Sequence, residues 1–253
     1  MMKEKRIIVE NLSKKFRIGA KKNRNALAQL VSFFSKNTEK DFWALKNISF
    51  SVKNGENIGI IGKNGSGKTT LLRTIAGIYE PDKAGIKVKG NLVYLSNLSN
   101  GLKPKLTVRD NIFLLGSITG LGQKDIKKKF NEIVDFAGLE NFVYSKIHQL
   151  SSGMIQRLAF SISIYSLKHS NPDIILLDEP FSEGNDEEFS RKALNEIEEL
   201  TKYERTAILV SHKIDLIKNC CNKAIWLDKG KIVKQGKADK VIEKYLKLTN
   251  KII

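Results

Sequence analysis

The sequence has only two cysteines, and this scarcity excludes the small folds that depend on disulfide bridges. Cys220 and Cys221 are neighbours in the chain, so they offer neither a disulfide framework nor the spacing of a metal-binding motif. We expect both thiols to be inert packing residues. The 253 residues are enough for one α/β domain with a substantial core, with or without a subdomain.

Long apolar runs are also absent. A membrane-spanning helix needs about 18 or more apolar residues in succession, whereas the best candidate, residues 112–115, is broken by Gly116. The apolar stretch at residues 7–9 is too short for a signal peptide, and Glu10 follows it at once. The sequence therefore predicts a protein that does not span the membrane, with the cytosol as its default location.

Acidic residues are scarce relative to basic ones. The chain has 27 Asp and Glu against 44 Lys and Arg, which gives a formal net charge of +17. Such a charge predicts an acidic partner, either nucleic acid or an anionic membrane surface. Residues 1–40 contain eleven of the basic residues and three acids, so we expect the docking surface there.

Residues 62–69 read GKNGSGKT and match the phosphate-binding pattern G-x-x-x-x-G-K-[ST] at every fixed position. The preceding residues 56–61 have the pattern of a buried strand and residues 70–76 that of a helix. Glycines let backbone N–H groups turn around phosphate oxygens, and the helix N-terminus is partly positive. We expect Lys68 to reach the β- and γ-phosphates of a nucleoside triphosphate and Thr69 to bind Mg²⁺. The predicted ATP-binding residues of the loop are Gly62, Lys63, Asn64, Gly65, Ser66, Gly67, Lys68, Thr69 and Thr70.

Two further apolar runs end in polar residues suited to phosphate chemistry. Residues 174–177 are typical of a buried parallel strand and lead into Asp178 and Glu179. Asp178 is expected to hold Mg²⁺, largely through water, and Glu179 to polarise the attacking water. Residues 207–210 lead into Ser211 and His212. His212 could hydrogen-bond the γ-phosphate or position the water, and the sequence favours neither role.

The remaining pattern divides the chain into strands and helices. Alternation predicts strands at 5–10 and 48–53, a strand pair within 85–95, strands at 173–178 and 206–211, and a hairpin at 224–233. Residues 105–165 are helical in pattern, and so is the tail at 238–248. Between the first two strands, residues 20–37 predict a basic amphipathic helix. It either packs on its own domain or lies at the membrane interface or against a membrane partner.

A second helix N-terminus is predicted at residues 150–158, LSSGMIQRL. Ser151 alone is a good N-cap, and the small residues after it suit an anion. Taken with the order of the other motifs, this segment resembles the signature sequence of ATP-binding cassette (ABC) ATPases, usually Leu-Ser-Gly-Gly-Gln. The signature residues would be Ser151, Ser152, Gly153 and Met154.

The resemblance implies an α/β fold with a P-loop NTPase (ABC ATPase) core, an antiparallel β subdomain and a helical subdomain at about 96–165. Residues 1–253 would form a single nucleotide-binding domain that ends in a helix at 238–253. ATP and Mg²⁺ would be its cofactors. Two copies would pair head to tail, so that residues 62–69 of one and 151–153 of the other enclose each ATP. An aromatic side chain would stack on adenine, with Phe16, Phe42 and Trp43 as candidates.

Several positions depart from the usual family pattern. Ser152 and Met154 replace glycine and glutamine, Leu98 after Asn97 stands where a coupling glutamine is usual, and Asn185 replaces an aspartate, although Asp186 follows. Together with the segments 42–46 and 181–185, these departures resemble the polysaccharide-export branch of the family.

Membership of that branch would imply the ATPase subunit of an exporter of lipid-linked teichoic acid, O-antigen or capsular polymer. It would work as a homodimer with an integral membrane permease, on the anionic cytoplasmic face of the inner membrane, and would bind no specific nucleic acid. In that branch the insert at 20–37 resembles a helix near the membrane entrance. The alternatives are an ABC ATPase for another exported substrate, such as a lipid or a drug, and a soluble ABC ATPase that acts with nucleic acid.

Overall fold

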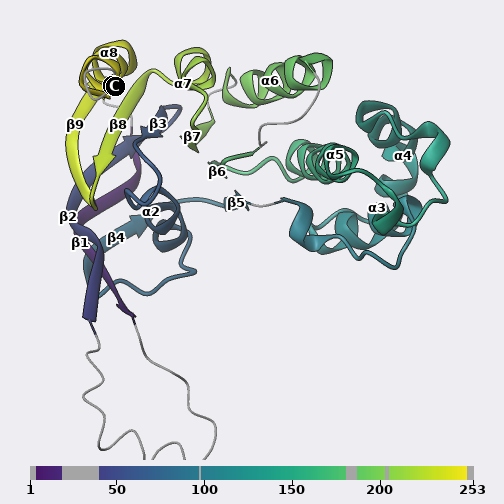
Figure 1. The fold of residues 1–253 in the computed structure, drawn as a ribbon, viewed down its shortest axis with the longest axis horizontal. Helices are drawn as coiled ribbons and strands as arrows, with labels where there is room; N and C mark the ends of the chain where they lie inside the picture. Colours follow the sequence, from purple (N-terminus) through teal and green to yellow (C-terminus); the bar gives the residue numbers. More distant parts are fainter. Residues whose placement is uncertain (1–3, 19–39, 97, 181–186, 203–204, 250–253) are drawn as a thin grey trace, which may run out of the picture.

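The computed structural model describes residues 4–18, 40–96, 98–180, 187–202 and 205–249. The predicted insert at 20–37 therefore lies outside the described residues, as do Asn97, Asn185, Asp186 and the end of the predicted tail helix. Two β-sheets and their covering helices form one part of the molecule, and a group of helices extends from it (Figure 1).

A six-stranded sheet forms the centre of the first part. Strands β5, β6, β7, β3 and β8 run parallel in that order, and β9 pairs antiparallel with β8 at the edge. All residues of β3, β6 and β7 are buried, as expected for parallel strands covered on both faces. The strands span β3 Asn57–Ile61, β5 Leu92–Ser96, β6 Ile174–Asp178, β7 Thr206–Val210, β8 Lys223–Asp228 and β9 Lys231–Lys237.

Four helices from different parts of the sequence pack against this sheet. Apolar residues of α6, α7 and α8 share one buried cluster with residues of β3, β6 and β7, whereas those of α2 belong to the cluster that joins the two sheets. Cys220 and Cys221 are free and buried in the first cluster, where burial raises the pKa of Cys220 to about 11. The helices span α2 Lys68–Ile75, α6 Glu187–Lys202, α7 Ile214–Cys220 and α8 Ala238–Thr249.

The second sheet has three antiparallel strands in the order β2, β1, β4. Strands β1 (Lys5–Ile18) and β2 (Lys40–Lys53) are longer than their alternation predicts. The pattern is interrupted because the β1–β2 register shifts at four places, and bulges of this kind break the period of two. The ladder continues to the pair Ile18 and Lys40.

The strand pair predicted within residues 85–95 is wrong. The chain does form two strands there, but β4 (Lys83–Val88) pairs with β1 and β5 pairs with β6 in the other sheet. Gly90, at φ +116°, turns the chain between them. Asn91 then donates its N–H to Asp173 Oδ2 at 2.8 Å, which aligns β5 with β6 instead of with β4.

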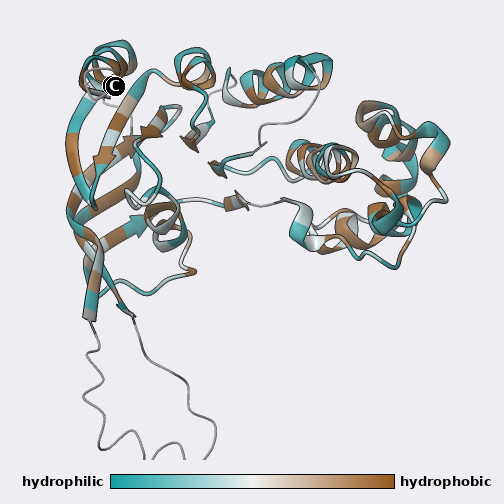
Figure 2. Cartoon of the chain, in the orientation of Figure 1, coloured by the Kyte–Doolittle hydropathy of each residue, from teal (hydrophilic) through white to brown (hydrophobic). Residues whose placement is uncertain are grey.

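The extending group is built around α3 (Val108–Ile118), α4 (Gln123–Ala137) and the first half of α5 (Ser152–Ser170). It has its own buried apolar cluster, and its helices carry hydrophobic segments, coloured brown, between hydrophilic ones (Figure 2). Helix α5 links this cluster to the main core, because Leu158 and Ile162 belong to the former and Ile164 to the latter. Short 3-10 turns complete the group at Leu98–Gly101, Glu140–Phe142 and Ile147–Gln149.

Within the described ranges, no helix has the length and apolar character needed to cross a membrane.

Candidate functional site

The loop at residues 62–67 connects β3 to α2 and depends on glycine at two tight positions. Gly62 has φ +153° and Gly67 has φ +107°, a region that L side chains rarely adopt. A Cβ at Gly62 would lie 2.1 Å from the Leu227 carbonyl oxygen, and one at Gly67 would lie 2.6 Å from that of Ala44. The loop therefore folds close against β8 and β2, with its backbone turned toward the start of α2.

Lys68 is the first residue of α2 and only 7% exposed. Its Nζ donates to the carbonyl oxygens of Gly62 at 2.8 Å and Lys63 at 3.3 Å. Burial lowers the pKa of Lys68, and the carboxylates of Glu179 and Asp178 oppose that shift. The ammonium group is thus folded into the loop, where it donates to carbonyl oxygens that phosphate oxygens can replace.

Asp178 ends β6 with both carboxylate oxygens engaged. The Thr69 hydroxyl donates to Oδ1 at 3.1 Å and the Tyr94 hydroxyl donates to Oδ2 at 3.0 Å. Burial raises the pKa of Tyr94, so the phenol keeps the proton that it donates. Parallel pairing places these groups together, because β5 and β6 end at the same edge of the sheet.

Glu179 and His212 follow the neighbouring strands β6 and β7 and meet at that edge. The His212 backbone N–H donates to Glu179 Oε2 at 3.4 Å, and His212 Nε2 lies 3.3 Å from Oε1. Burial raises the pKa of Glu179, whereas His212 lowers it. Glu179 adopts φ +49° and donates its N–H to the Val210 carbonyl at 3.0 Å. Its side chain is thereby fixed by an uncommon backbone conformation.

Lys68, Thr69, Glu179 and His212 line one cleft of about 340 Å³, and Asp178 adjoins it through its hydrogen bond to Thr69. The adenine candidates differ in their relation to it. Phe42, 49% exposed, lines the cleft, and Phe16 is its direct partner across the β1–β2 ladder, with its ring 5.4 Å from that of Tyr79. Trp43 does not line the cleft; the Lys15 ammonium lies 5.7 Å from its ring centroid. The described residues that line the cleft are Phe42, Ala44, Asn64, Gly65, Gly67, Lys68, Thr69, Thr70, Glu179 and His212.

The predicted signature residues lie elsewhere. Ser151 caps α5, with its Oγ accepting from the Met154 N–H at 3.2 Å. Ser151 and Ser152 are exposed. Ser151, Ser152, Gly153 and Met154 are all missing from the described lining of the cleft. A single copy of the chain does not bring its two predicted anion-binding helix ends together.

Three side chains near the site were not identified from the sequence: Arg73, Tyr79 and Tyr94. Arg73 Nε donates to the Tyr94 hydroxyl at 3.4 Å, and Nη1 donates to the Tyr79 hydroxyl at 2.9 Å. A partial signal exists, since Arg73 follows Thr69 by four residues and shares its face of α2. The pairing with Tyr94 on β5 depends on sheet topology, which no motif specifies.

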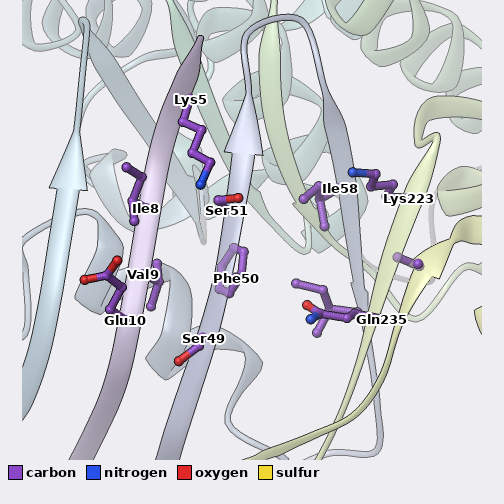
Figure 3. A pocket seen from close by; sticks show the side chains of 13 residues that line it. Lys5, Ile8, Val9, Glu10, Ser49, Phe50, Ser51, Ile58, Lys223 and Gln235 are labelled. Carbon is purple, nitrogen blue, oxygen red and sulfur yellow. The ribbon is translucent and has the colours of Figure 1, made fainter. Parts of the chain in front are cut away.

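A second hollow, of about 500 Å³, lies between strands β1 and β2 and the β8–β9 hairpin (Figure 3). Its charged lining residues Lys5, Glu10 and Lys223 are exposed, and Lys223 forms an ion pair with Glu56 at 2.5 Å. Because these exposed lining residues carry charges of both signs, they favour neither an anionic nor a cationic ligand.

Comparison with known proteins relates this arrangement to one family. Residues 45–182 match the family described as ABC transporter. The chain is 38% identical to the teichoic acids export ATP-binding protein TagH of Lactococcus lactis, over 96% of this chain and 51% of the relative. It is 36% identical to the TagH protein of Staphylococcus saprophyticus, over 96% and 88%. The O-antigen export system ATP-binding protein RfbB of Myxococcus xanthus is 35% identical over 80% and 45%.

The chain spans about half the length of several relatives that it matches, with 51% of the Lactococcus lactis protein and 45% of the Myxococcus xanthus protein. Among solved structures, it is similar to an ATP-binding cassette in a dimeric post-hydrolysis state bound to ADP and Pi. The TM-score is 0.70 at 23% identity, with 92% of this chain and 98% of the other covered. This likeness confirms the predicted fold class, an α/β cassette core with an antiparallel sheet and a group of helices.

Proposed function

The chain belongs to the ABC transporter family, as its motifs predicted, and from that premise we propose that it is the ATP-binding and ATP-hydrolysing subunit of a polysaccharide exporter. The cargo is a lipid-linked polymer of the teichoic acid or O-antigen type, as in the names of its relatives. The observation that carries the hydrolytic role is the meeting of Glu179 and His212 at the edge of a phosphate-binding loop.

The loop is built to receive the phosphates of ATP. The backbone of residues 62–67 and the N-terminus of α2 provide N–H donors and a partial positive charge. Ser66 Oγ is buried without a hydrogen-bond partner among the described residues, which leaves a polar atom for a ligand. Lys68 Nζ exchanges the Gly62 and Lys63 carbonyls for β- and γ-phosphate oxygens. Phe42, with Phe16 beside it, provides an aromatic surface for adenine.

The residues at the metal position fit Mg²⁺. No group of three or more His, Cys, Asp or Glu side chains able to hold a metal occurs in the described part of the chain. Mg²⁺ usually takes only one or two protein oxygens and completes its shell with water and substrate phosphates, and Thr69 and Asp178 offer such a pair. When bound there, the ion neutralises charge that develops on the phosphates.

Glu179 acts as the base that accepts a proton from the attacking water. His212 has two tasks in this arrangement: its backbone N–H fixes one oxygen of Glu179, and its ring lies beside the other, in reach of the cleft. The sequence left open whether His212 contacts the γ-phosphate or positions the attacking water. The two roles are compatible here, because His212 orients the base that acts on the water while its ring contacts the γ-phosphate.

The working unit is a homodimer. The signature residues Ser151 to Met154 of a second copy close the cleft over the γ-phosphate, because those of the same copy do not line it. The solved relative with the same fold is a dimer. ATP binding favours the closed dimer and hydrolysis releases it, in the manner of a ligand that shifts a population.

The partner in the membrane is an integral permease, and the net charge of +17 favours the anionic cytoplasmic face of the membrane. Nucleic acid is the alternative anionic partner. Any surface this basic binds nucleic acid weakly and without sequence preference, so weak binding alone does not support that alternative.

The deciding experiment is purification of the tagged full chain from detergent-solubilised membranes. We expect an integral membrane protein to co-purify and depletion of the chain to stop delivery of the polymer to the cell surface. A chain that associates with no membrane protein, and whose ATP turnover rises with added RNA or DNA, would instead support the nucleic-acid alternative.

The predicted insert provides a test of membrane contact. Deletion of residues 20–37 is expected to reduce polymer export in cells while the ATPase rate of the purified chain stays near wild type. The reason is that residues 20–37 fall between the paired strands β1 and β2, and that none of the described residues that line the cleft is removed. Export at the wild-type level after deletion would assign the segment to packing on its own domain.

A further inference from the structure

The Asp178 carboxylate is held from two sides by different elements. Thr69 from α2 donates to Oδ1 at 3.1 Å, and Tyr94 from β5 donates to Oδ2 at 3.0 Å. Asp178 is only 5% exposed, so water is a poor substitute for either donor. With both oxygens engaged, the carboxylate cannot rotate about its terminal bond without breaking a hydrogen bond in a buried place.

The Tyr94 hydroxyl is itself fixed. Arg73 Nε donates to it at 3.4 Å, while Nη1 of the same guanidinium donates to the Tyr79 hydroxyl at 2.9 Å. The Arg73 guanidinium carbon also lies 5.7 Å from the centroid of the Tyr79 ring. Because these contacts use both arms of a planar group, they restrict the position of Arg73 and hence the direction of the Tyr94 hydroxyl.

Helix α2 contributes at both ends of this chain of contacts. Thr69 and Arg73 are four residues apart and lie on one face of the helix. Thr69 reaches Asp178 directly, whereas Arg73 reaches it through Tyr94. A shift of α2, which begins at the phosphate loop, is thereby transmitted to both oxygens of the carboxylate.

We propose that Tyr94, held by Arg73, is a positioning residue that turns Asp178 Oδ1 toward Thr69, where the Mg²⁺ of the bound nucleotide is taken up. This inference rests on the proposed function, since it deepens the role of the same site. Tyr94 touches neither nucleotide nor metal in this scheme. Its hydroxyl occupies Oδ2, so only Oδ1 is left for Thr69, which itself lines the cleft.

The experiment measures Mg²⁺ uptake without turnover. A non-hydrolysable fluorescent ATP analogue is titrated into the full chain in EDTA and over a range of Mg²⁺ concentrations. In Tyr94→Phe, which keeps the ring and loses the hydroxyl, we expect the Mg²⁺ concentration for half-maximal effect to rise about tenfold. Affinity for the analogue in EDTA should stay within about twofold of wild type, because the loop and Lys68 are untouched.

A matched control is Tyr165→Phe. Tyr165 is also half-buried, and burial together with the nearby Glu132 carboxylate raises its pKa to about 12, but it lies in the group of helices outside the cleft. Its Mg²⁺ dependence should equal that of wild type. A tenfold shift in both variants would show that loss of any buried phenol loosens the protein, and would overturn the proposal.

Arg73→Gln tests the same contacts from the other end. It should shift Mg²⁺ dependence in the same direction by a smaller factor, and the double variant with Tyr94→Phe should shift it no further than Tyr94→Phe alone, because Arg73 acts through Tyr94. Additive effects would overturn the proposal. Thermal unfolding checks that each variant is folded, and if Tyr94→Phe is not, Arg73→Gln alone decides by its Mg²⁺ dependence.

The remaining outcomes are also decisive. If the Mg²⁺ dependence of Tyr94→Phe is unchanged, the hydroxyl has only a structural role. If Tyr94→Phe loses as much affinity for the analogue in EDTA as in Mg²⁺, the substitution has damaged the loop itself. Either result overturns the proposal. Failure of the wild-type chain to bind the analogue at all contradicts the proposed function, which keeps the two failures distinct.

Discussion

The N-termini of α2 and α5 are both suited to an anion, yet they are built in opposite ways. Helix α2 begins after Gly67, has no side-chain cap, and starts with the buried Lys68. Helix α5 begins after Ser151, which caps it by accepting from Met154 N–H, and both Ser151 and Ser152 are exposed. The N-terminus of α2 has no side-chain cap, so a ligand can take that place, whereas the N-terminus of α5 is already capped by Ser151. The difference is consistent with the proposal that α2 holds the nucleotide and that α5 of a second copy completes the site.

Glu179→Gln should have the largest effect on ATP turnover, and it tests whether hydrolysis takes place at the cleft beside α2. We expect ATP turnover to fall about 10³-fold because the base is lost, while affinity for ATP is retained. Steady-state phosphate release and analogue binding measure the two quantities. Glu140→Gln, at an exposed position of the helical group, is the control. Substantial residual turnover would remove Glu179 from the role of base.

Ser151→Arg tests whether α5 acts on the other copy. Turnover should fall about 10²-fold because a long cation at this position blocks the composite site that Ser151 completes, while each copy still binds ATP. Mixing this variant with Lys68→Ala should restore roughly a quarter of wild-type turnover, since half of the dimers are mixed and each contains one intact composite site. No recovery on mixing, or normal turnover of Ser151→Arg itself, would argue for a site within one chain.

Gly67→Ala tests the backbone that leaves α2 uncapped. We expect the free energy of unfolding to fall by about 3 kcal/mol, because a Cβ there combines a strained φ with a close contact to the Ala44 carbonyl. Gly120→Ala is the matched control, since Gly120 has φ +94° and open space around it, and it should cost only about 1 kcal/mol. Urea unfolding measures both. Equal costs would mean that the loop does not need its close approach to β2.

Ser151→Ala should have the smallest effect. Loss of the cap should lower the free energy of unfolding by about 1 kcal/mol, much as Thr107→Ala should at the start of α3, where Thr107 accepts from Asp110 N–H. Chemical denaturation measures the two variants side by side. A cost near zero at Ser151 alone would show that α5 needs its partner copy to be stabilised.

Much of the architecture was predictable because each motif combines chemistry with local structure. The runs ending at Asp178 and at Ser211 are apolar throughout, and such runs are typical of parallel strands buried on both faces. Their common edge then follows from parallel pairing, which is how the sequence brought Asp178, Glu179 and His212 to the phosphate loop.

What could not be predicted depends on contacts distant in sequence. Alternation within residues 85–95 indicated two strands but not that β4 and β5 join different sheets, because the period of two is the same in either. Tyr94 carries no motif, and its contact with Asp178 exists only once β5 lies beside β6. Likewise, Phe42 and Trp43 are neighbours in sequence, so alternation places them on opposite faces of β2 without specifying which of the two lines the cleft.

The pairing of Ile18 with Lys40 at the end of the β1–β2 ladder has a consequence for how such cassettes diversify. Directly paired residues lie about 5 Å apart, a distance that a two-residue turn also spans. The intervening stretch can therefore be lengthened, shortened or exchanged with little effect on the closing entropy of the loop. Changes of sequence there leave the pairing of β1 with β2 intact, and with it the position of Phe42 at the cleft.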